Sequence, residues 1–260
     1  HGFDVNVGGC DAGHPRSWWP PYRLPTLSDG PPGEYLTDRL TDEAIGLVEG
    51  AAADRAAGTD DRPFLLNLWH YAVHTPLEAP AELVAVQQRR ADERGLTEAD
   101  QVSDAGPMPY WNRGGQRMRR RSAQGNPTYA AMIANLDANI GRLLARLDEL
   151  GLADDTVVVF TSDNGGLHVN AASTANLPLA DGKGWLSEGG VRVPLIIDDP
   201  RRRRPDGTGT VVDTPFISPD LSPTLLELAG LPARPDQHVD GISRAGVVGA
   251  VDGVAVGGPG

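Results

Sequence analysis

Two oxygen-bearing side chains follow an apolar run in the middle of the chain and could bind a metal ion. Asp163 and Asn164 stand in the stretch VVVFTSDNGG, residues 157–166, directly after residues typical of a buried strand. A carboxylate beside a carboxamide offers the oxygen ligands that hard cations such as Ca²⁺ and Mg²⁺ prefer. Gly165 and Gly166 allow a sharp backbone turn, so that both side chains can face one point. The pattern predicts a metal site that needs further ligands from elsewhere.

A histidine and a lysine elsewhere in the sequence could act on an anionic substrate. His74 follows RPFLLNLWH, residues 62–70, a short apolar run that predicts a buried strand. Lys183 lies between glycines in DGKGW, which would allow it to approach an anion closely. Ligands of parallel α/β sheets bind outside the carboxyl ends of the strands. We therefore expect His74 and Lys183 to share one cleft with the predicted metal site.

Each of these residues also has an ordinary structural interpretation. The sequence DNGG is common in turns, where Asp and Asn bond to their own backbone. A single histidine such as His74 is more often a hydrogen-bonded core or loop residue than a catalytic one. Lys183 could equally be a surface lysine in a glycine turn. The choice depends on whether the residues occur together in a recognisable order.

Predicted helices and strands alternate along the chain, which is typical of an α/β domain with a mostly parallel sheet flanked by helices. In the clearest helix, residues 126–151, apolar residues keep helical spacing, Pro127 suits the first turn and Gly151 suits the C-terminal stop. Another helix has Thr37 or Asp38 as its expected N-cap. The predicted helices are 37–56, 79–95, 126–151 and 218–230, and the predicted strands are 62–70, 156–161 and 191–198.

Three segments are expected to be irregular. Residues 1–35 are rich in Gly, Pro and Trp, which is typical of irregular surface structure. Residues 96–126, with the basic run RGGQRMRRR, predict a flexible insertion whose arginines are solvated rather than bound to nucleic acid. From Arg244 the chain repeats Gly, Val and Ala without a period, so we expect 244–260 to be a disordered low-complexity tail.

The composition limits the possible partners. The net charge of −12 over 260 residues argues against nucleic acid, and an anionic substrate would need local positive charge or a metal. The single cysteine, Cys10, permits no internal disulfide, and no apolar run is long enough to span a membrane. The first ten residues lack an initiator Met and the pattern of a signal peptide, so we expect the chain to begin within a domain.

Several sequence blocks occur in an order that points to one family. They are HGFD at the start, RPFLLNLWHYAVHTPLEAP, the stretch ending in TSDNGG, LPLADGKGWLSEGGVRVPLII, and SPDLSPTLLELAGLP with HVDGIS, reaching about Ser243. Together they resemble the sulfatase family, arylsulfatase type. The resemblance implies an alkaline-phosphatase-like α/β fold, with residues 1–243 as part of a catalytic domain. It also implies hydrolysis of sulfate esters of small molecules or glycans.

The resemblance implies a role for each candidate residue. Asp163 and Asn164 would be two of the Ca²⁺ ligands. Lys183 would contact the sulfate and the leaving oxygen, and His74 would hold the sulfate or protonate the leaving group. Negative charge that builds on sulfate oxygens needs a cation, and a leaving alkoxide needs a proton donor, so these residue types suit the reaction. Two further charged residues match the family's lysine-loop block and are expected to support that loop: Glu188 and Arg192.

The sequence also departs from the family pattern. Sulfatases use a formylglycine made from the cysteine of C-x-P-S-R or C-x-A-S-R, whereas Cys10 stands in CDAGH. The paired aspartates and the second Lys/His pair of the family's N-terminal half are missing, and so is its small C-terminal subdomain. We therefore expect an incomplete catalytic domain, with the formylglycine belonging to the missing N-terminal half.

Three functions remain open from the sequence. The chain could be part of an arylsulfatase-like hydrolase, an inactive sulfatase fragment or pseudoenzyme, or a phosphoesterase of the same superfamily. Export to the periplasm or the medium would fit a full-length family member, but the sequence does not assign a compartment. It also specifies neither the particular sulfate ester nor the oligomeric state.

Overall fold

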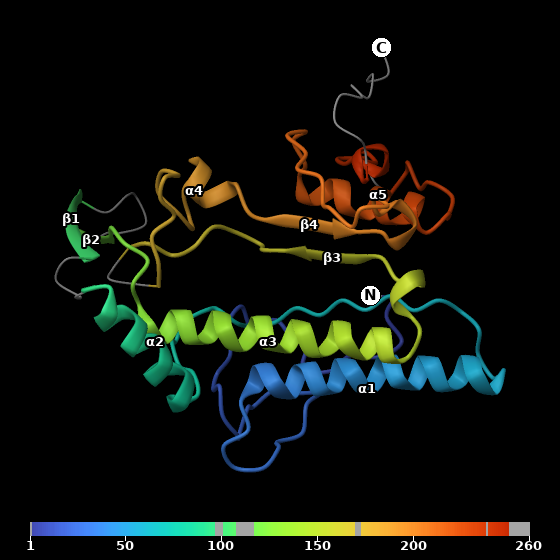
Figure 1. Ribbon diagram of the computed structural model, residues 1–260, viewed down its shortest axis with the longest axis horizontal. Helices are drawn as coiled ribbons and strands as arrows, with labels where there is room; N and C mark the ends of the chain where they lie inside the picture. The colour runs from blue at the N-terminus through green and yellow to red at the C-terminus, as the bar shows by residue number, and fades with distance from the viewer. Residues whose placement is uncertain (1, 97–100, 108–116, 170–172, 238, 250–260) are drawn as a thin grey trace. The chain divides into compact units, whose positions relative to one another are not determined.

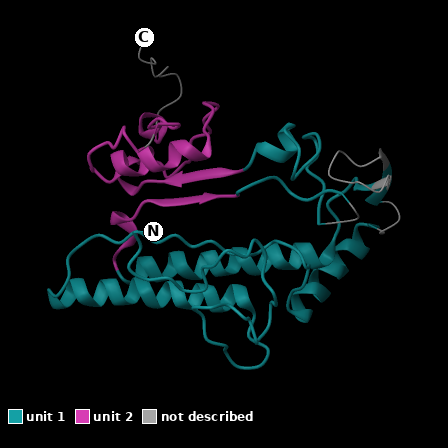
Figure 2. Ribbon diagram, turned by 180° about the vertical axis from the view of Figure 1, so that it is seen from behind, with its two compact units in different colours: residues 1–150, 163–193 teal, residues 151–162, 194–260 magenta. Residues whose placement is uncertain are grey.

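The computed structural model forms two compact units, drawn in different colours in Figure 2. Unit 1 comprises His1–Leu150 and Asp163–Val193, and unit 2 comprises Gly151–Ser162 and Pro194–Gly260. The residues that the structure describes are 2–96, 101–107, 117–169, 173–237 and 239–249.

Three helices dominate unit 1: α1 (Leu36–Ala57), α2 (Ala81–Glu93) and α3 (Pro127–Glu149). They confirm the predicted helices, and α1 and α3 lie side by side (Figure 1). The Asn126 side chain caps α3 by accepting a hydrogen bond from the Tyr129 backbone at 3.0 Å. The predicted N-cap of α1 is wrong, because α1 begins after Tyr35 and places Thr37 and Asp38 inside its first turn.

The first 35 residues supply much of the core of unit 1. They are irregular, as predicted, but Trp18, Tyr22 and Tyr35 are buried rather than on the surface. Trp18 donates its indole N–H to Pro76 O at 2.6 Å, and Tyr35 donates its hydroxyl to Glu78 O at 2.8 Å. These bonds fix the segment that carries His74 against the helices. The buried cluster consists of Trp18, Tyr22, Leu24, Leu27, Tyr35, Leu36, Leu40 and Met132.

The predicted insertion at 96–126 is ordered in part. Strands β1 (Val102–Pro107) and β2 (Arg117–Arg121) pair antiparallel, while 97–100 and 108–116 lie outside the described residues. Arg121 is buried and donates to Gln101 Oε1 at 2.9 Å, and its backbone N–H donates to His168 O at 2.7 Å. The expectation of a solvated basic loop is therefore wrong for the end of this run.

Residues 62–70 do not form the predicted strand. They run extended without pairing to a described strand, and Leu65 and Trp69 are 67% and 83% exposed. A strand needs a neighbour for its backbone N–H and C=O groups. The apolar composition of this segment was misleading because it indicated burial that Leu65 and Trp69 do not have.

The strands of unit 2 are β3 (Val158–Thr161) and β4 (Leu195–Asp198), which pair antiparallel from Val158↔Asp198 to Thr161↔Leu195. Both described ladders are thus antiparallel, and the expectation of a mostly parallel sheet is wrong for them. A parallel crossover usually contains a helix of several turns. The link between β3 and β4 instead contains loops and the four-residue α4 (Glu188–Val191), which lies in unit 1.

The rest of unit 2 is short helical segments. The helix predicted at 218–230 is present as a 3₁₀ turn, η4, continued by α5. The start of the expected tail forms the 3₁₀ turn η5, where Ala245 is fully buried, and 250–260 lie outside the described residues. The short elements are η2 (Ala153–Asp155), η3 (Pro200–Arg202), η4 (Ser218–Asp220), α5 (Leu221–Leu228) and η5 (Ala245–Val247). The mixture of helices and strands confirms the α/β class.

Candidate active site

Two of the four predicted site residues are in direct contact. Lys183 Nζ lies 3.1 Å from His74 Nε2, although 109 residues separate them in sequence, and both side chains are half-buried. Lys183 is also the only lysine of the chain, whose other 22 basic residues are arginines. The fold therefore brings this lysine to a histidine, where a surface lysine would point into solvent.

The backbone around His74 specifies how its ring is protonated. His74 Nδ1 lies 2.9 Å from the carbonyl oxygen of Thr75. A carbonyl can only accept, so Nδ1 carries the proton. In the neutral ring Nε2 is then the acceptor, and it receives a hydrogen bond from the Lys183 ammonium. The pair thus carries one positive charge, on Lys183, with a histidine nitrogen beside it that can gain a proton.

Backbone contacts set the position of the loop that carries Lys183. The Lys183 N–H donates to Gly166 O at 3.1 Å, and the Gly165 N–H donates to Gly190 O at 3.0 Å. Asn176 braces the same turn, because its amide donates to Gly166 O at 2.8 Å and its oxygen accepts from Gly166 N at 3.0 Å. The lysine loop is therefore bonded to the turn that directly follows Asp163 and Asn164.

Glycine is required where these backbones meet. A Cβ on Gly165 would lie 1.7 Å from Gly189 O, and a Cβ on Gly182 would lie 2.3 Å from Gly166 O. Real Cβ atoms do not approach backbone atoms this closely, so neither position accepts a side chain without movement of the loop. The glycines beside the lysine allow close packing of backbone on backbone.

Asp181 holds the base of the lysine loop. Its carboxylate accepts hydrogen bonds from Arg120 at 2.9 Å and from Ser187 Oγ at 2.7 Å, and its backbone is left-handed with φ +61°. The buried His168 lies beside it, with its ring edge-on to Trp185 at 4.7 Å. Burial lowers the pKa of His168, and Arg120 lowers it further, so the ring is neutral. No pattern in the sequence indicated this support.

The expected roles of Glu188 and Arg192 are not seen in their side chains. These two residues pair with each other at 3.1 Å, and both are exposed. The α4 segment supports the lysine loop through its backbone instead, because the Gly189 N–H donates to Ala180 O at 2.7 Å.

Asp163 and Asn164 follow β3 as predicted, but the described residues do not complete a metal site around them. Asp163 is exposed, and among the described residues no hydrogen bond or ion pair joins it to His74 or Lys183. Within the same residues, no three His, Cys, Asp or Glu side chains group as a metal site would require. Two oxygens suit the chemistry of Ca²⁺ but not its usual number of about 6–8 ligands.

Sequence reasoning missed one aromatic neighbour of His74. The ring of His14 stacks on that of His74, with centroids 5.9 Å apart and planes 21° apart. Its segment is held nearby, since Cys10 Sγ lies 3.4 Å from the Tyr71 hydroxyl. Burial raises the pKa of Tyr71 to about 12, with the bond to Cys10 adding to the effect, so the hydroxyl remains neutral. His14 lies in an irregular segment, where no periodicity could indicate its position.

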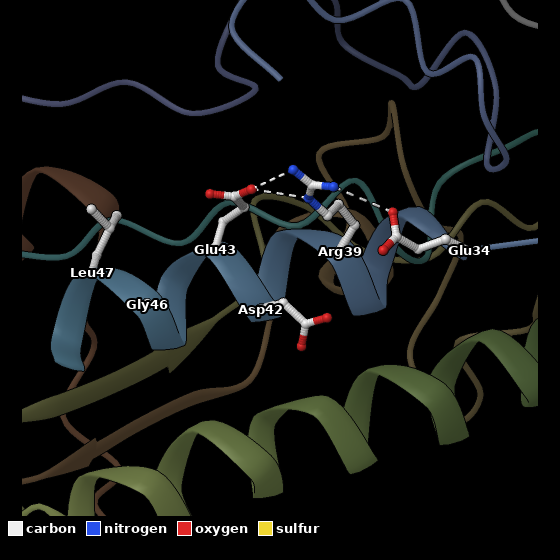
Figure 3. Close-up of a pocket in the computed structure, with 6 residues that line it drawn as sticks. All are labelled: Glu34, Arg39, Asp42, Glu43, Gly46 and Leu47. Atoms are coloured by element: carbon white, nitrogen blue, oxygen red, sulfur yellow. Dashed lines mark hydrogen bonds and ion pairs between the residues drawn. The ribbon is translucent and has the colours of Figure 1, made fainter. Parts of the chain in front are cut away.

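A shallow hollow of about 330 Å³ on α1 does not suit an anion (Figure 3). Its guanidinium, Arg39, is bonded to Glu43 at 2.6 Å and lies 3.6 Å from Glu34. Asp42 adds a third carboxylate to the lining. The hollow is therefore acidic overall and its one cation is already paired, so it is not a candidate for binding an anion.

Comparisons with known proteins identify the family of the chain. The sulfatase family model matches residues 1–231, so the chain belongs to the sulfatase family, whose fold is alkaline-phosphatase-like. A sulfatase from Formosa agariphila is 32% identical over 235 residues, which is 86% of this chain and 35% of that protein. Human steryl-sulfatase is 38% identical over 215 residues, 80% of this chain and 28% of the relative.

A solved structure supports the same fold. The crystal structure of Ps i-CgsB in complex with k-i-k-neocarrahexaose is 30% identical, with a TM-score of 0.60, and the match covers 83% of this chain and 38% of that one. The chain thus spans roughly a third of the length of the relatives that it matches. In its described part, no helix combines the length and apolar character needed to cross a bilayer.

Proposed function

We propose that the chain carries the sulfate-binding lysine and histidine of a sulfuric ester hydrolase. The observation that supports the proposal is the 3.1 Å contact between Lys183 Nζ and His74 Nε2 within a chain of the sulfatase family. A sulfate ester is anionic, and negative charge develops on the leaving oxygen as the S–O bond breaks. The Lys183 ammonium neutralises this charge, and His74 holds the sulfate or donates a proton to the leaving oxygen.

The proposed substrate class is a sulfate ester of a small molecule or a glycan. The solved relative with a TM-score of 0.60 is titled as a complex with an oligosaccharide. Asp163 and Asn164 are proposed to contribute two oxygens to a Ca²⁺ site, which no group of three His, Cys, Asp or Glu side chains completes among the described residues. Calorimetry should then give a Kd for Ca²⁺ weaker than about 10⁻⁴ M. Sub-micromolar binding that Asp163→Ala abolishes would contradict this incomplete set of ligands.

The covalent nucleophile is proposed to lie outside this chain. Cys10 is exposed and stands in CDAGH, which does not match the family's formylglycine motif. The purified chain is therefore expected not to hydrolyse p-nitrophenyl sulfate above background. Turnover that disappears in Lys183→Ala would overturn this part of the proposal.

Inorganic sulfate is the probe that tests the site itself. Because Lys183 is the only lysine, reductive ¹³C-methylation labels it and the N-terminal amine, and keeps both charges. Sulfate, titrated against chloride at constant ionic strength, should shift the Lys183 signal with saturation and leave the N-terminal signal unchanged. His74→Ala should weaken the saturable shift. An unchanged Lys183 signal, or equal shifts of both amines, would refute the site.

A further inference from the structure

A third nitrogen-bearing side chain accompanies the His74–Lys183 pair. The exposed ring of His14 stacks on the half-buried ring of His74 at 5.9 Å. Two features hold the His14 segment in place. Pro15 is buried, and Cys10 Sγ lies close to the Tyr71 hydroxyl. The stacked position is thus built into the fold of unit 1.

His14 and His74 have the same arrangement of ring protons. His14 Nδ1 lies 3.2 Å from Pro15 O, just as His74 Nδ1 lies near Thr75 O. Both rings therefore hold a proton on Nδ1 and have Nε2 available for another partner. The Nε2 of His74 accepts from Lys183, whereas the Nε2 of His14 has no partner among the described residues.

The charges around the three residues favour an anion. The chain contains 35 acidic residues, yet within its described part no carboxylate pairs with His14, His74 or Lys183. Three groups that carry or can gain positive charge are therefore collected without compensation in a protein of net charge −12. The charge of the Lys183 ammonium is therefore not neutralised by a carboxylate, and it favours a bound oxyanion.

We propose that His14 is a substrate-binding residue that contacts the sulfate together with His74 and Lys183. On binding, His14 Nε2 takes up a proton from solvent and donates a hydrogen bond to a sulfate oxygen. No covalent bond is formed or broken at His14. This inference rests on the proposed function, because it extends the same anion site to a third residue from the N-terminal segment.

The sulfate titration described above also tests this inference, with the histidine ring signals recorded alongside Lys183. The key variant is His14→Phe, which keeps an aromatic ring to stack on His74 but removes both nitrogens. The wild-type His14 signals should shift with the same Kd as Lys183. His14→Phe and His14→Ala should each weaken sulfate binding about tenfold, as expected for the loss of a hydrogen bond to a charged group.

The alternative outcomes are distinct. If sulfate shifts Lys183 and His74 but not His14, and His14→Phe binds as the wild type does, the inference fails and the proposed function stands. If His14→Phe binds normally and His14→Ala does not, His14 only orients His74, and the direct contact is refuted. If sulfate shifts none of the signals, the proposed function fails and the inference with it.

A charge control separates a specific contact from general attraction. Arg62→Ala removes one positive charge from an exposed residue of unit 1 that pairs with Asp60. This variant should bind sulfate with unchanged affinity. If it weakens binding as much as His14→Phe does, the effect of His14 is one of overall charge, and the inference is overturned.

Discussion

Close packing at glycines helps to determine where Lys183 lies. Gly182 packs its Cα against the turn at Gly166, and its immediate neighbour Lys183 bonds to that turn through the backbone. Such contacts leave no room for a methyl group. A lysine placed in this way depends on the conformation of its loop more than on its own side-chain packing.

Gly182→Ala should therefore destabilise unit 1. The new Cβ would lie 2.3 Å from Gly166 O, 2.5 Å from the Asn176 amide nitrogen and 2.6 Å from His168 Nδ1. Forcing extra volume into a packed site typically costs about 1–3 kcal/mol of unfolding free energy. Urea denaturation followed by tryptophan fluorescence would measure the loss.

The matched control is Gly141→Ala in α3. The new Cβ would meet nothing within 4 Å there, and alanine should stabilise the helix by about 0.5–1 kcal/mol. Equal effects of the two changes would refute the steric argument.

His70 should make stability depend on pH. Both of its ring nitrogens are buried without a described partner, and burial lowers its pKa from 6.5 to about 4. The unfolded chain binds a proton at His70 more readily than the folded chain does. The neutral His70 ring therefore contributes fully to the free energy of unfolding above about pH 6.5. This contribution is lost as the pH falls from about 6.5 to 4, and the free energy of unfolding then changes by up to about 1.4 kcal/mol per pH unit.

The test compares the wild type with His70→Phe, which fills similar space and cannot titrate. The free energy of unfolding, measured in urea at several pH values from 7 to 5, should fall less steeply for the variant. Contributions of other groups, including His168, are present in both proteins and cancel in the comparison. Identical slopes would show that the His70 ring is hydrated in the native state.

Among the elements, polar residues join α1 to α3. The Asp38 carboxylate accepts hydrogen bonds from Asn135 Nδ2 at 2.8 Å and from Asn139 Nδ2 at 2.6 Å. Both asparagines are buried. Asp38 thus specifies how the two helices pair.

Asp38→Ala should cost about 2–4 kcal/mol of unfolding free energy, because it leaves two buried amide donors without their acceptor. Asp38→Asn retains one acceptor oxygen and should cost less. Asp42→Ala serves as the control: it removes a half-exposed ion pair to Arg142 on the same two helices and should cost at most about 1 kcal/mol. Circular dichroism in urea would rank the three variants. If Asp42→Ala were the more damaging change, the buried contact would not be the dominant one.

The helices could be predicted from sequence because their signals are local. Asn126, Pro127 and Gly151 mark the ends of α3 within a few residues of where they occur. Strand pairing could not be predicted in the same way, since it depends on contacts between distant residues. The antiparallel pairing of β3 and β4 depends on the path of the chain between them, which apolar composition does not reveal.

At the scale of the whole molecule, His74 and Lys183 were expected to share one cleft with Asp163 and Asn164, and the structure brings His74 Nε2 and Lys183 Nζ within 3.1 Å of each other. The route proposed for that contact was nevertheless wrong, because residues 62–70 form no described strand and the described ladders are not parallel. The lysine loop reaches its place through bonds to Gly166 instead. The stacking of His14 on His74 could not be predicted, because the segment of His14 has no periodicity and the contact spans 60 residues of sequence.

The exposed apolar side chains of residues 62–70 also affect how the purified chain should behave at high concentration. Leu65 and Trp69 lie on an extended backbone without a described partner strand, an arrangement that favours intermolecular pairing. Mutual repulsion at a net charge of −12 opposes such pairing. Salt shortens the range of that repulsion from about 10 Å at 0.1 M to about 3 Å at 1 M.

Adding NaCl to roughly 1 M should therefore promote self-association. Light scattering should rise with salt for the wild type and much less for Trp69→Ser, which removes the more exposed of the two side chains. Scattering that stays constant with salt would mean that these side chains do not cause self-association. If scattering does rise with salt, low ionic strength keeps the chain dispersed. Crystallisation or spectroscopy in concentrated salt will then encounter aggregates that form through this segment.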